Sequence, residues 1–236
     1  MDIRTGVLTS AGGRAVNDDT VQILQQDNRL LVFVGDGLGG YAGGAAASQA
    51  ASQAALTALS RSNSISEDAL QKAAALAEDA VKQLQSAQRG DMKTTLVLLA
   101  MENDQARWMH IGDSRLYHFR RGHLLSQTLD HSVSQLAVLM GQIQPHEIRF
   151  HEDRNRVLRA LGSANARPDI SPATAVEPED AFLLCTDGFW EYVTEPQMEQ
   201  LLQNASSPQQ WLERMAQLLR RAPADHDNYT AAAVFC

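Results

Sequence analysis

Short apolar runs that end in glycine and aspartate constrain this chain of 236 residues more than any other feature. Leu30–Val34 is continuously apolar and leads into Gly35-Asp36-Gly37, and Ala181–Thr186 leads into Asp187-Gly188. Runs of this length that stop at turn residues are typical of buried strands. We therefore expect strands at these two places and also at Thr94–Ala100, Ala106–Ile111, Arg115–Arg120 and Tyr229–Cys236. Gly112-Asp113-Ser114 is expected to form the turn between Ala106–Ile111 and Arg115–Arg120.

Helical patterns fall between the strands. The alanine-rich stretch Ala45–Leu59 predicts one helix, and Ser64-x-x-Glu67 is a capping-box pattern for a second that ends near Arg89. Two more are expected over Ser132–Met140 and from Ser207-Pro208 to about Arg221, with serine as N-cap and proline at the first helical position. The order of elements lacks regular β–α alternation. It indicates an α+β fold with sheet packed on sheet and helices outside, in one domain over residues 1–236.

Composition narrows the function classes. The hydrophobic fraction of 44% is enough for a full core. A net charge of −8 makes the chain a poor ligand for nucleic acid, which is held largely by phosphate neutralisation. Because the sequence has neither a signal-peptide pattern nor eighteen consecutive apolar residues, we expect no membrane insertion and a cytoplasmic protein. Cys185 and Cys236 lack metal-ligand spacing, and we interpret Cys185 as a buried free thiol.

Aspartates recur where the predicted strands end. Taken singly, each is a common turn residue. Strands of one sandwich tend to end on a shared rim, however, and carboxylates gathered there would repel one another strongly. Mg²⁺ and Mn²⁺ relieve such repulsion and prefer oxygen ligands, so the pattern predicts a two-metal site. The aspartates concerned are Asp18, Asp19, Asp36, Asp113, Asp187 and Asp227.

Arg14 and a glycine-rich segment add to this hypothesis. Glycine lets a backbone carbonyl approach a metal closely, and Gly35 to Gly40 is dense in glycine. A phosphate-cradling loop is the rival interpretation, but the Gly-x-x-x-x-Gly-Lys-Ser/Thr motif is absent. Arg14 alone would be a solvated surface charge; beside the aspartates it is a candidate clamp for phosphate, because a guanidinium binds phosphate oxygens in pairs.

The order of the motifs resembles that of the metal-dependent PP2C-type (PPM) serine/threonine protein phosphatases, in their bacterial form. The resemblance runs from about Thr5 to Cys236. It rests on Gly12–Asp19, Val34–Gly40, Thr94-Thr95, Gly112–Tyr117, Thr128–Ser132, Arg159–Gly162, Cys185–Trp190 and Asp227–Thr230.

This resemblance implies a fold and a set of site residues. The fold would be a four-layer α-β-β-α sandwich of two packed, mainly antiparallel sheets flanked by helix pairs. Arg14, Asp36 and Asp187 would be the catalytic residues, with Arg14 on the substrate phosphate. Two Mn²⁺ or Mg²⁺ ions, with a third in some relatives, would be held by Asp19, Asp36, the Gly37 carbonyl, Asp113, Asp187 and Asp227, supported from behind by Asp18 and Asn228.

Three positions depart from the family pattern. Asp18 stands where glutamate is usual, Leu38 where some eukaryotic relatives have a histidine, and Lys93 where a small residue is common. None of these changes removes a predicted metal ligand. The family also implies a flap near the active site, which would be the segment 130–161. His131 and His226 are interpreted as structural histidines.

The implied activity is hydrolysis of phosphoserine and phosphothreonine on proteins by a metal-activated water. The partners would be phosphoproteins, typically the substrates of a cognate bacterial Ser/Thr kinase. The enzyme itself would be a monomer. Two alternatives stay open: a two-metal hydrolase of another phosphoester, and a catalytically silent PPM regulatory module. The sequence does not name the phosphoprotein, the physiological metal or the general acid.

Overall fold

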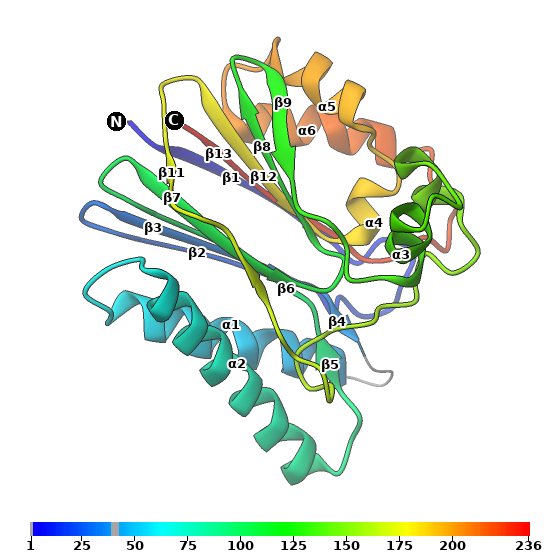
Figure 1. Cartoon of the computed structure of the whole chain (residues 1–236). Coiled ribbons are helices and arrows are strands. Elements are labelled where there is room, and N and C mark those ends of the chain that lie inside the picture. The colour runs from blue at the N-terminus through cyan, green and yellow to red at the C-terminus, as the bar shows by residue number, and fades with distance from the viewer. Residues whose placement is uncertain (1, 39–42) are drawn as a thin grey trace.

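Two antiparallel sheets pack face to face in the computed structural model, which describes residues 2–38 and 43–236 (Figure 1). The five-stranded first sheet has the order β1 (Arg4–Ser10), β13 (Tyr229–Phe235), β12 (Asp180–Cys185), β8 (Arg115–Arg120), β9 (His123–Gln127). The six-stranded second sheet has the order β10 (Asp169–Ile170), β7 (Gln105–Ile111), β6 (Leu96–Glu102), β3 (Arg29–Gly35), β2 (Thr20–Gln26), and β11 (Thr174–Ala175) also pairs with β7. A small third ladder joins β4 (Gly37–Leu38) to β5 (Lys93–Thr94).

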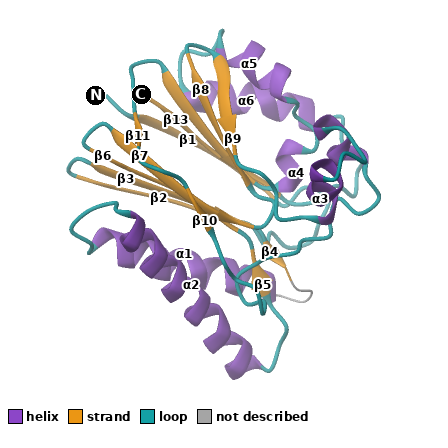
Figure 2. Ribbon diagram, in the orientation of Figure 1, coloured by secondary structure: helices purple, strands orange, loops and turns teal. Residues whose placement is uncertain are grey.

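Helices cover both outer faces of this pair of sheets (Figure 2). The second sheet is covered by α1 (Gly43–Ser60) and α2 (Glu67–Gln88). The first sheet is covered by α4 (Asp187–Trp190), α5 (Glu195–Leu202) and α6 (Pro208–Leu219). Between β9 and β10 lie α3 (Val133–Leu139) and the 3₁₀ helix η1 (Pro145–Phe150). The predicted α+β class and four-layer sandwich are confirmed, and no described helix is long and apolar enough to span a bilayer.

The central strands explain why their sequences are apolar without interruption. Successive side chains of a strand point to opposite faces, and both faces of β3 are covered. Leu31 and Phe33 face the α1–α2 layer, whereas Leu30 and Val32 pack between the sheets. In β12 the alternate residue Cys185 faces the α4–α6 layer, fully buried and unpaired, as predicted.

The start of α2 differs from the expectation. The N-cap is Ser66, whose side chain accepts a hydrogen bond from the Ala69 N–H at 3.2 Å, and not Ser64. The reason is hydrophobic: Ile65, just before the cap, and Leu70, in the first turn, are buried in the same cluster. Such a hydrophobic staple sets where the chain enters the helix, so the helix begins after Ile65.

The interval around Thr95 also differs from the sequence prediction. Thr94–Ala100 is two strands and not one, because the Thr95 backbone N–H and hydroxyl bind Asp36 in place of a ladder partner. The turn at Gly112–Ser114 connects strands of different sheets, since β7 and β8 lie in opposite layers. The part of the glycine-rich segment at Gly39 and Gly40 lies outside the described residues. Strands β1, β2 and β9 were not foreseen, because polar residues interrupt their apolar pattern.

The cap assignment can be tested with a matched pair of serine variants. Ser66→Ala should lower the free energy of unfolding by about 1 kcal/mol, because one N–H of the first turn of α2 loses its acceptor. Ser64→Ala should change it by less than about 0.5 kcal/mol, as expected of a surface position. Urea denaturation of both variants measures the difference. A larger loss in Ser64→Ala would contradict the assignment.

Candidate active site

The predicted acidic residues meet at one edge of the sandwich. Asp36 follows β3, Asp113 follows β7, Asp187 follows β12 and Asp227 precedes β13. A cavity of about 360 Å³ lies among them. Its lining includes Arg14, Asp18, Asp36, Gly37, Asp113, Asp187, Asp227 and Asn228, which are all the predicted site residues except Asp19.

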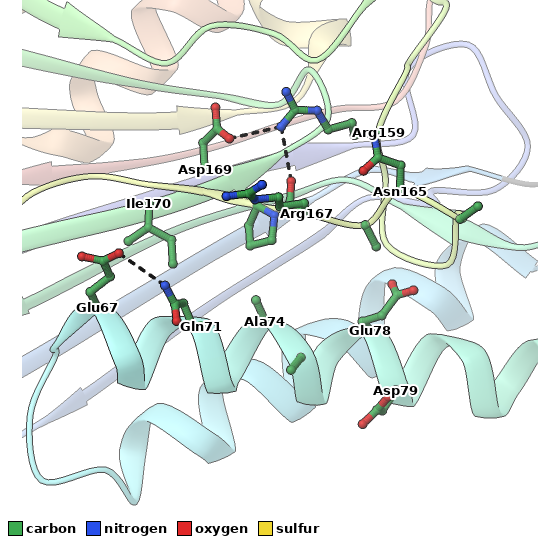
Figure 3. Close-up of a pocket in the computed structure, with 14 residues that line it drawn as sticks. Glu67, Gln71, Ala74, Glu78, Asp79, Arg159, Asn165, Arg167, Asp169 and Ile170 are labelled. Carbon is green, nitrogen blue, oxygen red and sulfur yellow. Dashed lines mark hydrogen bonds and ion pairs between the residues drawn. The ribbon is translucent and has the colours of Figure 1, made fainter.

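A larger cavity of about 1180 Å³ lies elsewhere, beside α2 (Figure 3). Glu67, Glu78, Arg159, Arg167 and Asp169 are among the residues that line it. None of the residues predicted to bind metal or phosphate borders it. Size therefore does not identify the reactive site in this fold; the carboxylates do.

Threonines of the β5–β6 junction hold Asp36 in place. The Asp36 N–H donates to the Thr95 hydroxyl at 2.8 Å, and the Asp36 carbonyl accepts from the Thr95 N–H and the Thr94 hydroxyl, both at 2.9 Å. The next residue must be glycine, because a Cβ on Gly37 would lie 2.2 Å from the carbonyl oxygen of Gly44. The Thr-Thr pair thus fixes the carboxylate at the centre of the site from behind.

Asn228 ties the loop after β1 to the start of β13. Its side-chain amide donates to the carbonyls of Ala11 and Val16, each at 2.9 Å, and accepts from the Asp18 N–H at 2.8 Å. The Asp18 carboxylate in turn accepts from the Ala45 N–H at 3.0 Å, so it caps the first turn of α1. Both residues therefore shape the site through contacts with the backbone.

Burial and mutual repulsion raise the pKa of four carboxyl groups in this cluster. Burial comes first for each; for Asp36 and Asp187, which rise well above the ordinary value, neighbouring aspartates add to it. The pKa of Asp19 rises to about 7 despite hydrogen bonds from Thr230 and Thr186, and that of Asp113 also rises to about 7. Ionising all of them together is unfavourable unless a positive charge lies between them.

Two observations match this cluster to divalent cations. Asp19 Oδ1 and Asp113 Oδ1 are buried and have no hydrogen-bond partner, so each oxygen is free to bind an ion. The donors are oxygens only, as magnesium and manganese prefer. The carboxylates are spread wider than a closed site: among the described residues, no three aspartates offer oxygens all within 4.8 Å of one another. Joint ligation therefore requires side-chain rotations from the positions described here.

Arg14 lies at the rim of the cavity. Its side chain is 56% exposed, and one nitrogen donates to Asp227 Oδ2 at 3.1 Å. A guanidinium has five N–H donors, so most remain available to a ligand. The contact with Asp227 orients the Arg14 guanidinium toward the acidic cluster.

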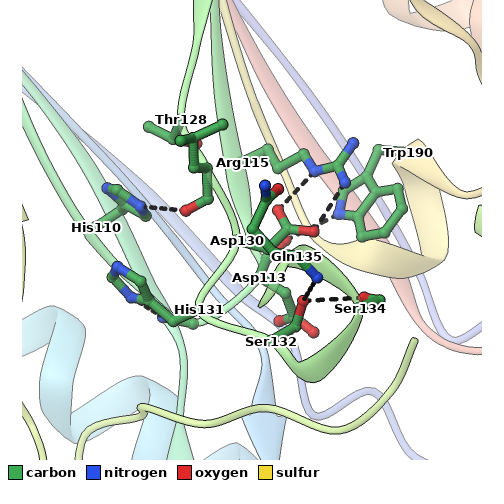
Figure 4. A network of polar contacts seen from close by, with 12 residues as sticks. His110, Asp113, Arg115, Thr128, Asp130, His131, Ser132, Ser134, Gln135 and Trp190 are labelled. Atoms are coloured by element: carbon green, nitrogen blue, oxygen red, sulfur yellow. Dashed lines mark hydrogen bonds and ion pairs between the residues drawn. The ribbon is translucent and has the colours of Figure 1, made fainter. Parts of the chain in front are cut away.

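A buried polar network behind Asp113 was not assigned any role from the sequence (Figure 4). Arg115 binds both oxygens of Asp130, at 2.7 and 2.8 Å, and lies 3.5 Å from the ring centre of Trp190. The Trp190 indole N–H donates to the Asp113 carbonyl at 2.9 Å. Arg115 and Asp130 both lie in motifs noted in the sequence, but only the β8–β9 hairpin reveals that they pair.

The comparisons with known proteins agree with this architecture. The sequence matches the family "Protein phosphatase 2C" over residues 11–227. The serine/threonine protein phosphatase PstP of Mycobacterium tuberculosis is 34% identical over 112 residues, a match that covers 48% of this chain and only 22% of PstP. The serine/threonine phosphatase stp of Listeria monocytogenes is 30% identical over 198 residues, covering 80% of this chain and 78% of stp.

A solved structure of the PstP catalytic domain in complex with two manganese ions superposes with a TM-score of 0.85 at 26% identity. The alignment covers 99% of this chain and 97% of that one. The chain described here belongs to the protein phosphatase 2C family, and the resemblance seen in its motifs is confirmed.

The raised pKa of Asp113 gives a pH-dependent prediction for chelator-treated protein. Between pH 3.8 and about 7 the native Asp113 binds more protons than the unfolded one, so its contribution to stability falls as the pH rises through this window. Asp113→Asn removes this contribution. As the pH rises, the free energy of unfolding of the wild type should therefore fall relative to that of the variant. Urea denaturation with chelator present measures both. A pH-independent difference would contradict the raised pKa.

Proposed function

We propose that this chain is a metal-dependent protein serine/threonine phosphatase that hydrolyses phosphoserine and phosphothreonine. The observation that carries the proposal is the convergence of six segments of the chain on one small cavity, which brings together buried carboxylates with an exposed arginine at the rim. Family membership and the two manganese ions of the PstP structure support it.

In this proposal the aspartates hold two Mn²⁺ or Mg²⁺ ions. Asp36, Asp187 and Asp227 would hold one ion, and Asp36 with the Gly37 carbonyl would contribute to the other. Asp113 and Asp187 would hold a third ion, and Asp19 lies in or behind the set. When bound, such ions lower the pKa of a water and offset the charge of the phosphoryl oxygens.

The chain's own side chains supply binding and exclude other mechanisms. Arg14 binds the phosphate oxygens with the donors that Asp227 leaves free. Leu38 has no proton to give, so this position does not protonate the leaving serine or threonine oxygen. Cys185 is fully buried and burial raises the pKa of its thiol, so it does not act as a nucleophile. In this proposal the attacking group is a water.

The segment 130–161 is proposed as a flap that contacts the protein substrate, within one catalytic domain over residues 1–236. Asn155 and Val157 line the same cavity as Asp36, which supports this role for the segment. The flap also exposes large apolar side chains, with Leu139 69% and Phe150 81% exposed. Exposed apolar surface of this kind is suited to binding a peptide.

We further propose a monomeric, cytoplasmic, bacterial signalling enzyme that opposes a Ser/Thr kinase. A hydrolase acting on another phosphoester is the second candidate, because an open cavity of this size also admits a nucleotide. A silent regulatory module is less favoured, since every acidic residue of the expected metal site is retained.

Asp36→Asn tests the metal assignment. The change removes the charge shared by both ion positions, so manganese-dependent hydrolysis of a phosphothreonine peptide should fall by about 10³-fold or more. Circular dichroism should show an unchanged fold. Near wild-type turnover in this variant, or equal rates in chelated and manganese-loaded wild type, would refute the proposal. Faster hydrolysis of nucleotides than of phosphopeptides would favour the second candidate.

Arg14→Lys tests the phosphate clamp. Lysine keeps the charge but loses the paired N–H donors, so kcat/KM should fall about 10- to 100-fold, with a raised KM, because hydrogen bonds to charged groups contribute about 1.5–3 kcal/mol. Manganese affinity, measured by titration calorimetry, should change little. Loss of metal binding with unchanged KM would assign Arg14 to the support of Asp227.

A further inference from the structure

Two histidines and an aspartate form a second cluster outside the acidic cavity. His110 lies on β7, His131 follows β9, and Asp169 on β10 is the strand partner of His110. One donor atom of each lies within 4.8 Å of the other two, and no other such trio of His, Cys, Asp or Glu occurs among residues 2–38 and 43–236. The two rings are stacked, with centres 4.6 Å apart and planes 15° apart (Figure 4).

The hydrogen bonds of these rings leave a lone pair free on His110 and direct the ring proton of His131 toward the Asp169 carboxylate. His110 Nε2 donates to the Leu129 carbonyl at 2.8 Å, which leaves the lone pair on Nδ1. A backbone carbonyl behind the ring is the usual support of a metal-binding histidine. His131 Nε2 is buried and lies 3.2 Å from Asp169 Oδ2. Because His131 Nδ1 accepts from the Gly112 N–H, Nε2 carries the ring proton and can bind a cation only when that proton leaves it.

The protonation states suit cation binding. Both histidines are 6% exposed, and burial lowers the pKa of each, that of His131 to about 4 with a further effect from His110. The pKa of Asp169 is lowered as well: burial raises it, but the His131 ring and Arg159 outweigh that effect. At neutral pH the cluster therefore offers two neutral imidazoles and one carboxylate.

The cluster is open to solvent on one side. The Asp169 side chain is 59% exposed and lines the large cavity beside α2, together with Glu67 and Glu78 (Figure 3). Arg159 binds Asp169 Oδ1 at 3.1 Å, which orients the carboxylate and leaves Oδ2 facing His131. Asp169 is thus the member of the cluster that faces the cavity and solvent.

We propose that His110, His131 and Asp169 bind one transition-metal cation of the Zn²⁺ class, separate from the oxygen-only acidic site. Two imidazoles and a carboxylate suit a borderline cation such as Zn²⁺, whereas Mg²⁺ prefers oxygen ligands alone. The missing fourth ligand is left to water.

Occupancy of this site would act on the turn that carries Asp113. His131 Nδ1 accepts from the Gly112 N–H at 3.2 Å, and the backbone N–H of His131 donates to the Gly112 carbonyl at 2.8 Å. A cation on Nε2 moves the ring proton to Nδ1, where it faces the Gly112 N–H, so the first hydrogen bond and the cation exclude each other. Zn²⁺ should therefore loosen the Gly112 turn and inhibit the acidic site from outside it.

Zn²⁺ titration calorimetry on the Mg²⁺-saturated full chain tests this proposal. His110→Gln keeps a donor for the Leu129 carbonyl, and His131→Asn keeps an acceptor for the Gly112 N–H, while each removes the ring nitrogen proposed to bind the cation. Wild type should bind one Zn²⁺ equivalent that both variants lose or bind much more weakly. The rise in Kd should exceed the roughly 10- to 100-fold expected when only a hydrogen-bond partner of a metal ligand is lost. The electron paramagnetic resonance spectrum with Cu²⁺ should show coupling to two nitrogens in wild type and to at most one in each variant.

Matched aspartate variants complete the test. Asp169→Asn is an exposed change that should preserve folding and weaken the same Zn²⁺ site, whereas the exposed Asp91→Asn should leave it intact. Equal Zn²⁺ binding in wild type, His110→Gln, His131→Asn and Asp169→Asn would overturn the proposal and place Zn²⁺ in the acidic cavity. Because binding is measured directly, the outcome does not depend on whether the chain is a phosphatase.

Discussion

Repulsion among buried carboxylates is the constraint around which the rest of the structure is arranged. Asp36, Asp113 and Asp187 each have a pKa raised by burial and by neighbouring acids. Left to themselves, such groups would separate or draw in water. The fold opposes this with a rigid double sheet whose strands end at one edge, so that the backbone, and not attraction between the side chains, keeps the acids together.

Each loop at this edge is secured by a hydrogen bond to a neighbouring element. Thr95 holds Asp36, Asn228 holds the loop that carries Arg14, and the Trp190 indole holds the Asp113 carbonyl. Arg115 stacks on that indole and is itself neutralised by Asp130. The buried ion pair thus supports the turn that carries the predicted ligand Asp113 through Trp190, which gives these two charges a structural role in an apolar layer.

Gly112 connects this acidic edge to the histidine cluster. Its N–H and carbonyl both bond to His131, and the following residue is Asp113. With φ at +103° and no room for a Cβ against Thr95, the turn requires glycine and has little freedom to adjust. The proposed Zn²⁺ site is therefore linked to the acidic cavity by direct hydrogen bonds to the residue that precedes Asp113.

The sequence by itself determined the local features: the apolar strands, the capped helices, the family motifs and which aspartates follow strand ends. It could do so because these depend on residues close together in the chain. Only the tertiary structure decided the start of α2 at Ser66, the break at Thr95, the pairing of Arg115 with Asp130 and the stacking of His110 on His131. Each of these depends on packing or on contacts between separate strands and loops, and no local pattern specifies which of the distant partners will be brought within hydrogen-bonding distance.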